Sequence, residues 1–143
     1  MPDEELAVVR EQYEATNRRD FARVMDLYAD NVVLRAPRAE GVQNPGTYEG
    51  KEAVGDWFGD WFQTFDRDYR FEIEEIREVR PDLIFMVASH GGRGRLSGVE
   101  VHTHNAYLYR VRDGKISEVG FFATRDDALE AASLPEWSRP ETD

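Results

Sequence analysis

The second half of the chain is a succession of strand-forming segments joined by turns, and this pattern most limits the folds open to it. Apolar residues from Tyr69 to Ile73 alternate with polar ones, and the alternation slips by one residue at Glu74, which is typical of a β-bulge and of a bent strand. Asp113-Gly114 is a strong hairpin signal. Further strands are expected at 83–90, 99–112 and 115–123, with a glycine-rich connection at 91–98. The segments predict an antiparallel meander.

The first half of the chain predicts helices ahead of this sheet. Apolar residues recur at helical spacing, Asp20 is placed to cap the second helix, and a short strand is expected to begin at Val32. The expected helices span 4–18, 20–28 and 50–65, with an irregular loop at 36–49 and a last helical turn after Thr124. This order predicts an α+β domain with helices on one face of a bent sheet. We expect one domain over 1–134 and a loose tail over 135–143.

Charge and composition exclude several classes of function. The net charge of −11 repels nucleic acid and anionic membrane surfaces. The chain has no cysteine, which excludes disulfides, thiol catalysis and thiolate metal sites. The longest apolar run, Leu83 to Ala88, is too short to span a bilayer, and residues 1–6 are acidic and unlike a signal segment. We therefore expect a cytoplasmic protein with no nucleic-acid and no membrane partner.

Several local strings resemble the SnoaL-like proteins of the nuclear-transport-factor-2-like superfamily, which includes ketosteroid isomerases and polyketide cyclases. The resemblance rests on residues 17–20, 27–30, 48–53, 92–100, 112–116 and 125–131. It implies a cone-shaped, bent antiparallel sheet capped by N-terminal helices, an α+β barrel whose concave side holds an apolar pocket. It also implies that no metal or organic cofactor is needed. Because this superfamily carries many activities on one scaffold, the resemblance specifies the fold better than the chemistry.

Two known chemistries of the superfamily are not expected here. Ala36 falls where the resemblance places the carboxylate base of ketosteroid isomerases, and Tyr107 falls where it places their acid. Gln12 lies nearer than Tyr13 to the position of the first-helix tyrosine. Phe121 occupies the position of a last-strand aspartate in epoxide hydrolases. Steroid isomerisation and epoxide hydrolysis by those routes are therefore not predicted.

Strand alternation in 99–112 selects the residues that face the pocket. The face that ends in Tyr107 and Tyr109 is the more apolar one, so we expect it to point inward. Trp57 and Trp61 lie one helical turn apart and either pack the helix on the sheet or form an aromatic wall for a flat ligand. The candidate catalytic residues are Tyr107 and Asn105. The candidate ligand-binding residues are Tyr13, Trp57, Trp61, Thr103, Tyr109, Val119 and Phe121.

The three histidines allow a second interpretation. If the 91–98 connection centres near residue 96, His90 lies opposite His102 and beside His104, and three imidazoles could bind zinc or relay protons. We expect this face to point outward and to be covered by a second copy of the chain, so no metal site is predicted. The expected homodimer interface contains Met86, Leu108, Phe122, His102 and His104, together with Ile84 and Ala88. If His102 and His104 faced the pocket instead, they would be the alternative catalytic residues of a dehydratase-like enzyme.

These observations predict a protein with a pocket for a small apolar molecule. The first hypothesis is a cofactor-independent isomerase, cyclase or dehydratase that acts on a carbonyl-containing or polyketide-like compound, with Asp56 at the helix rim as a further candidate base. The alternatives are a non-catalytic binder of small molecules and a dimeric interaction module of the same fold. The missing carboxylates favour the binder, whereas a pocket filled by side chains would favour the module.

Overall fold

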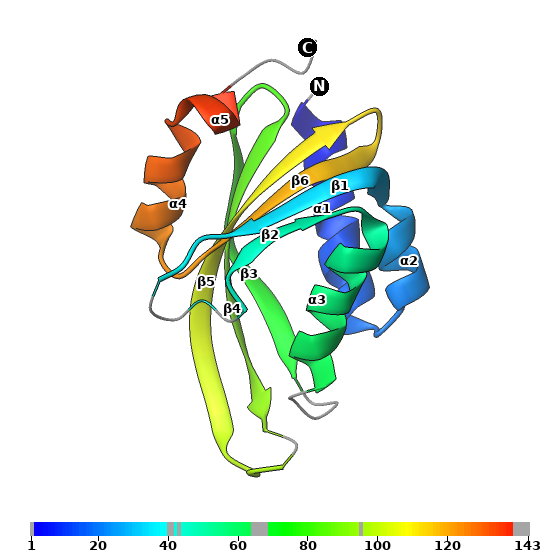
Figure 1. Cartoon of the computed structure of the whole chain (residues 1–143), viewed down its shortest axis with the longest axis vertical. Coiled ribbons are helices and arrows are strands. Elements are labelled where there is room, and N and C mark those ends of the chain that lie inside the picture. The colour runs from blue at the N-terminus through cyan, green and yellow to red at the C-terminus, as the bar shows by residue number, and fades with distance from the viewer. Residues whose placement is uncertain (1, 40–41, 43, 64–68, 95, 139–143) are drawn as a thin grey trace.

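A six-stranded sheet forms the centre of the molecule (Figure 1). The computed structural model describes residues 2–39, 42, 44–63, 69–94 and 96–138. The strand order is β2-β1-β6-β5-β4-β3, and neighbouring strands are antiparallel except β1 and β6, which run parallel. The strands are β1 (Tyr28–Ala36), β2 (Gly46–Glu49), β3 (Arg70–Arg80), β4 (Leu83–Arg93), β5 (Glu100–Arg112) and β6 (Lys115–Phe122).

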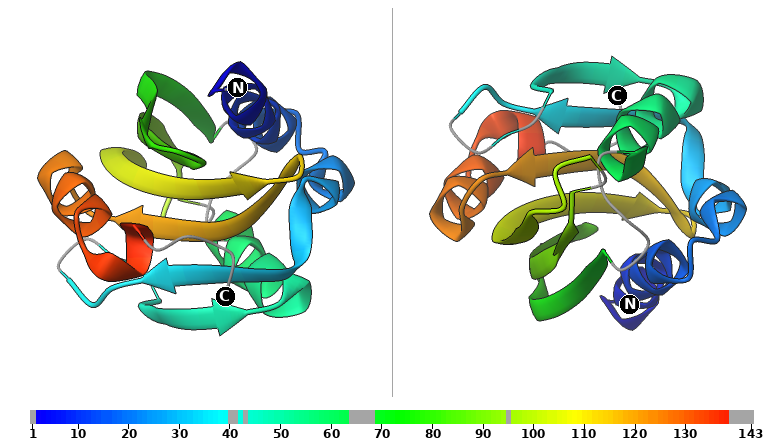
Figure 2. Two further views of the ribbon diagram at one scale, coloured as in Figure 1. Left: turned by 90° about the horizontal axis from the view of Figure 1, so that it is seen from above. Right: turned by 90° about the horizontal axis from the view of Figure 1, so that it is seen from below.

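Helices cover both sides of this curled, open sheet (Figure 2). The helices are α1 (Pro2–Asn17), α2 (Phe21–Asp26), α3 (Lys51–Gln63), α4 (Arg125–Ala132) and α5 (Pro135–Ser138). The first three lie along the concave side, and α4 and α5 lie on the opposite side. The predicted α+β architecture, a bent sheet capped by N-terminal helices, is confirmed. Among the described residues, no helix is long and apolar enough to cross a membrane.

Two boundaries in the first half differ from the prediction. Tyr28 begins β1 and does not end the second helix, because α2 stops at Asp26 and Leu27 caps it. Residues 46–49 form β2, which pairs with the end of β1. The bulge predicted near Glu74 is present, since the β3–β4 register shifts between Ile73 and Glu75.

The register of the β4–β5 hairpin differs by one residue from the prediction. His90 pairs with Thr103, and His102 pairs with Gly91. The turn sets this register: Gly98 has a φ of 68° and its N–H bonds to the Gly94 carbonyl at 2.9 Å. A slip of one residue moves a whole strand face to the other side of the sheet. The residues Ile84, Met86, Ala88 and His90 therefore belong to the concave face.

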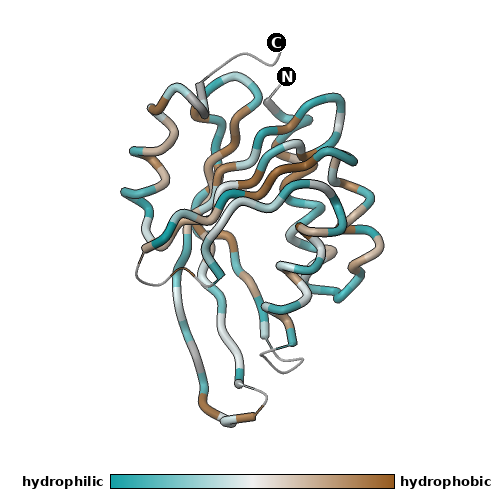
Figure 3. Tube along the Cα trace, viewed as in Figure 1, coloured by the Kyte–Doolittle hydropathy of each residue, from teal (hydrophilic) through white to brown (hydrophobic). Residues whose placement is uncertain are grey.

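Helices of the same chain cover the apolar part of the convex face, which corrects the places of Leu108, Phe122 and Met86 in the predicted dimer interface. Leu108 is fully buried and Phe122 is 5% exposed, and both pack against α4 and Trp137 of α5. Met86 lies on the other face. Figure 3 shows the apolar residues gathered along the central strands, between these two helical layers. The sheet is apolar on both faces, as expected, but α4 and α5 provide the second cover that the sequence assigned to a partner.

The tail also differs from the expectation. Residues 135–138, predicted to be loose, form α5, whose Trp137 is 2% exposed. Arg110 donates a hydrogen bond to the Trp137 carbonyl and pairs with Glu118 at 2.7 Å, so α5 is tied to the sheet. Residues 139–143 lie outside the described residues.

Candidate functional site

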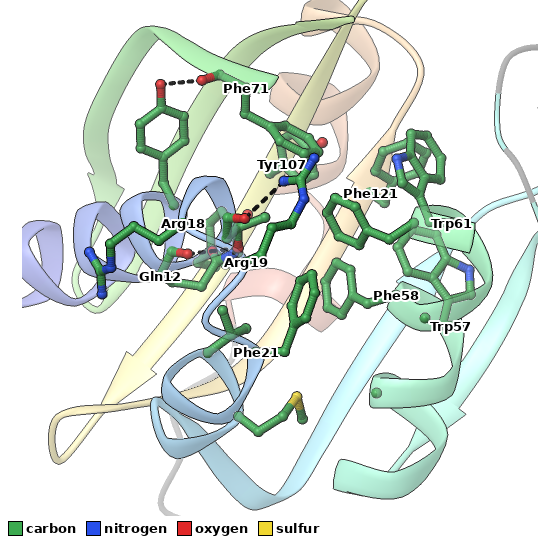
Figure 4. A pocket seen from close by; sticks show the side chains of 18 of the residues that line it. Gln12, Arg18, Arg19, Phe21, Trp57, Phe58, Trp61, Phe71, Tyr107 and Phe121 are labelled. Carbon is green, nitrogen blue, oxygen red and sulfur yellow. Dashed lines mark hydrogen bonds between the residues drawn. The ribbon is translucent and has the colours of Figure 1, made fainter. Parts of the chain in front are cut away.

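A cavity of about 760 Å³ lies between the three N-terminal helices and the concave face of the sheet (Figure 4). Its wall is mostly aromatic and apolar, with a polar edge along α1. The rings on the wall are Tyr13, Phe21, Trp57, Phe58, Trp61, Phe62, Phe71, Tyr107, Tyr109 and Phe121. The remaining described lining residues are Gln12, Thr16, Arg18, Arg19, Val24, Met25, Gly55, Gly59, Gln63 and Met86. A concave, mainly apolar site with a few polar groups is the usual form of a small-molecule pocket.

The two tryptophans predicted as a wall lie on this cavity. Trp57 and Trp61 stack with their ring centroids 5.9 Å apart and an interplanar angle of 28°. Phe121 of β6 meets both rings edge-on, at 5.4 and 5.5 Å. The Trp57 indole donates to the Asn44 carbonyl at 3.1 Å, which fixes its orientation. Both interpretations of the two tryptophans therefore apply, since the indoles pack α3 on the sheet and also line the cavity.

The glycines of α3 leave room beside these indoles. A side chain at Gly59 would meet no atom within 4 Å, although glycine costs a helix interior about 1 kcal/mol relative to alanine. A Cβ added at Gly55 would lie 3.8 Å from the Met25 side chain, an ordinary van der Waals contact. Both glycines line the cavity, so their small size enlarges the open space.

Tyr107 supplies a hydrogen-bond donor to the cavity. Its ring stacks on Tyr109 at 5.8 Å and meets Phe121 edge-on at 5.4 Å. The side chain is 6% exposed and lies on the cavity lining. Burial raises the pKa of Tyr107 well above 10, and the neighbouring Tyr109 and Tyr69 raise this pKa further. The phenol is therefore neutral and able to donate at any physiological pH.

The polar edge comes from α1. Gln12 is 6% exposed and donates from Nε2 to the Thr16 hydroxyl at 3.2 Å, while its Oε1 has no partner within the described residues. Tyr13, a predicted ligand-binding residue, lines the cavity and donates from its hydroxyl to the Phe71 carbonyl. Gln12 was absent from the predicted binding residues, although its place near the family's first-helix tyrosine was a usable signal.

The charged residues on the described wall are both cationic. Arg19 donates to the Thr16 carbonyl at 3.0 Å and lies 5.1 Å from the centroid of the Phe62 ring. Arg18 is about half exposed and pairs with Glu11 at 3.4 Å. No carboxylate lines the cavity in the part of the chain that the structure describes. Asp56, the candidate base at the helix rim, is exposed and is not among the lining residues.

Three predicted site residues face the concave side but do not line the cavity. Asn105 is 4% exposed and lies behind the wall, where its amide binds His90 and the Phe122 carbonyl. Thr103 pairs with His90 further along the β4–β5 hairpin, which extends beyond the helices (Figure 1). Val119 is 1% exposed and packs in the inner core between β1 and β5. Alternation found the correct face of β5, but it could not tell which stretch of that face the helices leave open.

The histidines do not form the predicted cluster. His102 and His104 are exposed on the convex side, and His104 Nδ1 lies 3.1 Å from Glu74 Oε1. Neither ring faces the cavity, so they do not serve as its base. His90 instead points to the concave side and is 2% exposed, beside Trp61 and Phe71. Among the described residues, no group of three His, Cys, Asp or Glu side chains could hold a metal ion.

The comparisons with known proteins agree with this geometry. Residues 9–119 match the family model described as a SnoaL-like domain. No curated protein sequence matches the chain at a significant level. Solved structures share the fold at low identity, which is evidence for the fold alone.

Three of these structures show the range of relatives. TerC, co-crystallised with polyporic acid, has a TM-score of 0.72 and 16% identity, over 89% of this chain and 96% of that chain. RV0760c from Mycobacterium tuberculosis, in complex with estradiol-17β-hemisuccinate, has a TM-score of 0.71 and 21% identity, over 88% and 97%. A putative SnoaL-like polyketide cyclase from Jannaschia sp. CCS1 has a TM-score of 0.73 and 17% identity, over 94% and 95%.

Proposed function

The chain belongs to the SnoaL-like domain family, and from its cavity we propose that it binds a flat, apolar small molecule that carries a carbonyl group. The volume of about 760 Å³ suits a ligand of two to four fused rings, since small-molecule pockets measure roughly 300–1,000 Å³. The ligands of TerC and RV0760c, polyporic acid and estradiol-17β-hemisuccinate, support this class of compound.

The observation that carries the proposal is the Tyr107 hydroxyl. A hydrogen bond of this kind contributes about 0.5–1.5 kcal/mol net, so a ligand oxygen that accepts the Tyr107 proton gains affinity in that range. The stacked rings of Trp57 and Trp61 would hold the flat part of the ligand, and Tyr107 would orient the carbonyl. The phenol stays neutral because burial raises its pKa, so its proton remains available to a ligand oxygen.

Catalysis of the isomerase, cyclase or dehydratase type would use the same hydrogen bond. A donor aimed at a carbonyl oxygen stabilises the enolate that forms when a proton leaves the adjacent carbon. The missing part is a base, because no carboxylate lines the described wall and both ring nitrogens of His90 already have partners. This observation favours the second candidate function, a non-catalytic carrier of the same ligand. No metal or organic cofactor enters either proposal.

The test uses two ligands that differ only in the acceptor. 2-Acetylnaphthalene has a carbonyl where 2-isopropenylnaphthalene has a methylene group, so their affinities separate the hydrogen bond from ring burial. By calorimetry the ketone should bind the wild type more tightly, and Tyr107→Phe should remove about 1–2 kcal/mol from the ketone alone. Tyr28→Phe is the matched control, because the Tyr28 hydroxyl is buried away from the cavity lining and has no described partner. Equal affinity of both compounds for the wild type contradicts the proposed role of Tyr107.

One further measurement separates the enzyme from the carrier. An enzyme that forms enolates accelerates exchange of the ketone's methyl hydrogens for deuterium in heavy water, which proton NMR follows directly. A carrier binds the ketone and leaves the exchange rate at the buffer value. The lack of a described carboxylate on the wall leads us to expect the buffer value.

A further inference from the structure

A network of hydrogen-bonded, buried polar side chains lies behind the cavity wall and reaches Trp61. It comprises Asn105 of β5, His90 of β4 and Tyr69 just before β3, with exposures of 4%, 2% and 0%. None of these three lines the cavity. The proposed ligand contacts do not use them, yet burying so many polar atoms is costly unless each has a partner.

The partners fix the direction of every hydrogen bond in this network. A carbonyl oxygen only accepts, so the Asn105 amide nitrogen donates to the Phe122 carbonyl, at 3.3 Å, and the amide oxygen faces His90. His90 Nε2 lies 2.5 Å from that oxygen and must carry the proton. His90 Nδ1 is then the bare nitrogen and accepts the proton of the Tyr69 hydroxyl. The structure thus specifies a single tautomer of His90.

At its other end the network reaches Trp61, a residue of the cavity wall. The presence of the Trp61 indole opposes the increase in the Tyr69 pKa that burial causes. The His90 ring also contacts the indole directly, with ring centroids 5.5 Å apart, and stacks on Phe71 at 4.9 Å. The His90 ring, which Tyr69 and Asn105 hold by hydrogen bonds, therefore supports Trp61 from behind.

The position of the network in the fold explains how it supports Trp61. Helix α3 packs on β1 and β2, at one edge of the sheet, whereas Tyr69, His90 and Asn105 belong to the opposite half. A Cβ at Gly92 would lie 2.6 Å from the Tyr69 Cα, so glycine there lets Tyr69 come close enough to reach His90. The network thus connects the two halves of the curled sheet through Trp61.

We propose that Tyr69, His90 and Asn105 are positioning residues that hold the Trp61 indole in the orientation in which it forms the cavity wall. The proposal rests on the proposed function only where ligand binding is concerned, because the tautomer and the state of Trp61 are properties of the ligand-free protein. It also gives Asn105 a role different from the catalytic one that the sequence suggested.

The ligand-free test is NMR on the full chain. Two-bond proton–nitrogen correlation at pH 7 should show His90 as the Nε2–H tautomer. Tyr69→Phe removes one of the two hydrogen bonds that hold the His90 ring against Trp61, so it should speed solvent exchange of the Trp61 indole N–H by about threefold to tenfold, and Tyr28→Phe should not. A His90 Nδ1–H tautomer, a charged His90, or unchanged Trp61 exchange in Tyr69→Phe overturns the proposal. If Tyr69→Phe does not fold, the wild-type tautomer decides.

Ligand binding then distinguishes positioning from direct contact. Tyr69→Phe should weaken 2-acetylnaphthalene and 2-isopropenylnaphthalene alike, by about threefold to tenfold, because both stack on the same wall. Tyr107→Phe should weaken only the ketone. A Tyr69→Phe loss confined to the ketone would mean that Tyr69 itself contacts the ligand, contrary to the proposal. If neither compound binds the wild type, the proposed function fails while the NMR results still decide the positioning role.

Discussion

Acidification should destabilise the fold through His90. Burial lowers the pKa of His90 from 6.5 to about 4, an effect that outweighs the opposing hydrogen bond to Asn105 and is increased by His104. The physical reason is the burial of the ring, because a charged imidazolium at this 2% exposed site would lose its hydration. In the unfolded chain the same imidazole titrates normally.

The magnitude follows from the two pKa values. Between pH 6.5 and pH 4 the unfolded chain binds a proton at His90 and the folded chain does not, so the free energy of unfolding falls as the pH falls. At 1.36 kcal/mol per pH unit the loss amounts to about 3 kcal/mol, and it is complete near pH 4. Above pH 6.5 the imidazole is neutral in both states and contributes no pH dependence.

The assay is urea denaturation between pH 7 and pH 4 on the wild type and on His90→Phe. The variant keeps a ring between Phe71 and Trp61, but this ring cannot bind a proton. The carboxylates contribute equally to the pH dependence of both proteins, so their contribution cancels in the difference between the two curves. The variant will be less stable at pH 7, because the Tyr69 and Asn105 side chains lose their partner, but its stability should fall less steeply with pH. His102→Gln, an exposed histidine, should keep the wild-type slope. Equal slopes in wild type and His90→Phe would refute the reasoning.

Two more predictions concern packing. Leu108→Glu should destabilise the fold by at least about 3 kcal/mol in thermal or urea denaturation, because Leu108 is fully buried beneath α4. Leu134→Glu, at a 44% exposed site, should change little. If Leu108→Glu leaves stability intact, its proposed cover by α4 is wrong. Gly92→Ala should cost about 1–3 kcal/mol, since the new methyl group meets the Tyr69 backbone, whereas Gly59→Ala should be neutral or stabilising. Equal effects of the two alanines would contradict this comparison.

The element order could be predicted from the sequence because it depends on local signals. The alternation around Ile73, its slip before Glu75 and the Asp113-Gly114 turn each act over a few residues, and all three appear in the structure. The β4–β5 register could not be predicted in the same way. It depends on whether a glycine-rich turn centres on a residue or between two, and that choice decides whether His90 lies on the concave or the convex face of the sheet.

The candidate site shows the same limit. The inward face of β5 was assigned from the apolar ending at Tyr107 and Tyr109, and the structure places both rings on the cavity. Asn105 shares that face, but only the packing of α3 and Tyr69 decides that it lies behind the wall. The cover of the convex face was missed because Trp137 follows a proline in a short polar tail, whose composition resembles a disordered end.

The parallel pairing of β1 with β6 has a consequence for how the chain folds during synthesis. Leu34 pairs with Val119, so β1 has no partner on that side until nearly the whole chain has left the ribosome. At about 5–20 residues per second, the aromatic rings of α3 wait several seconds for the strands that bury them. Such long-range pairing also slows folding in general. We therefore expect the nascent chain to expose its ligand-binding rings before the cavity exists. At that stage chaperones would have to shield these rings from aggregation.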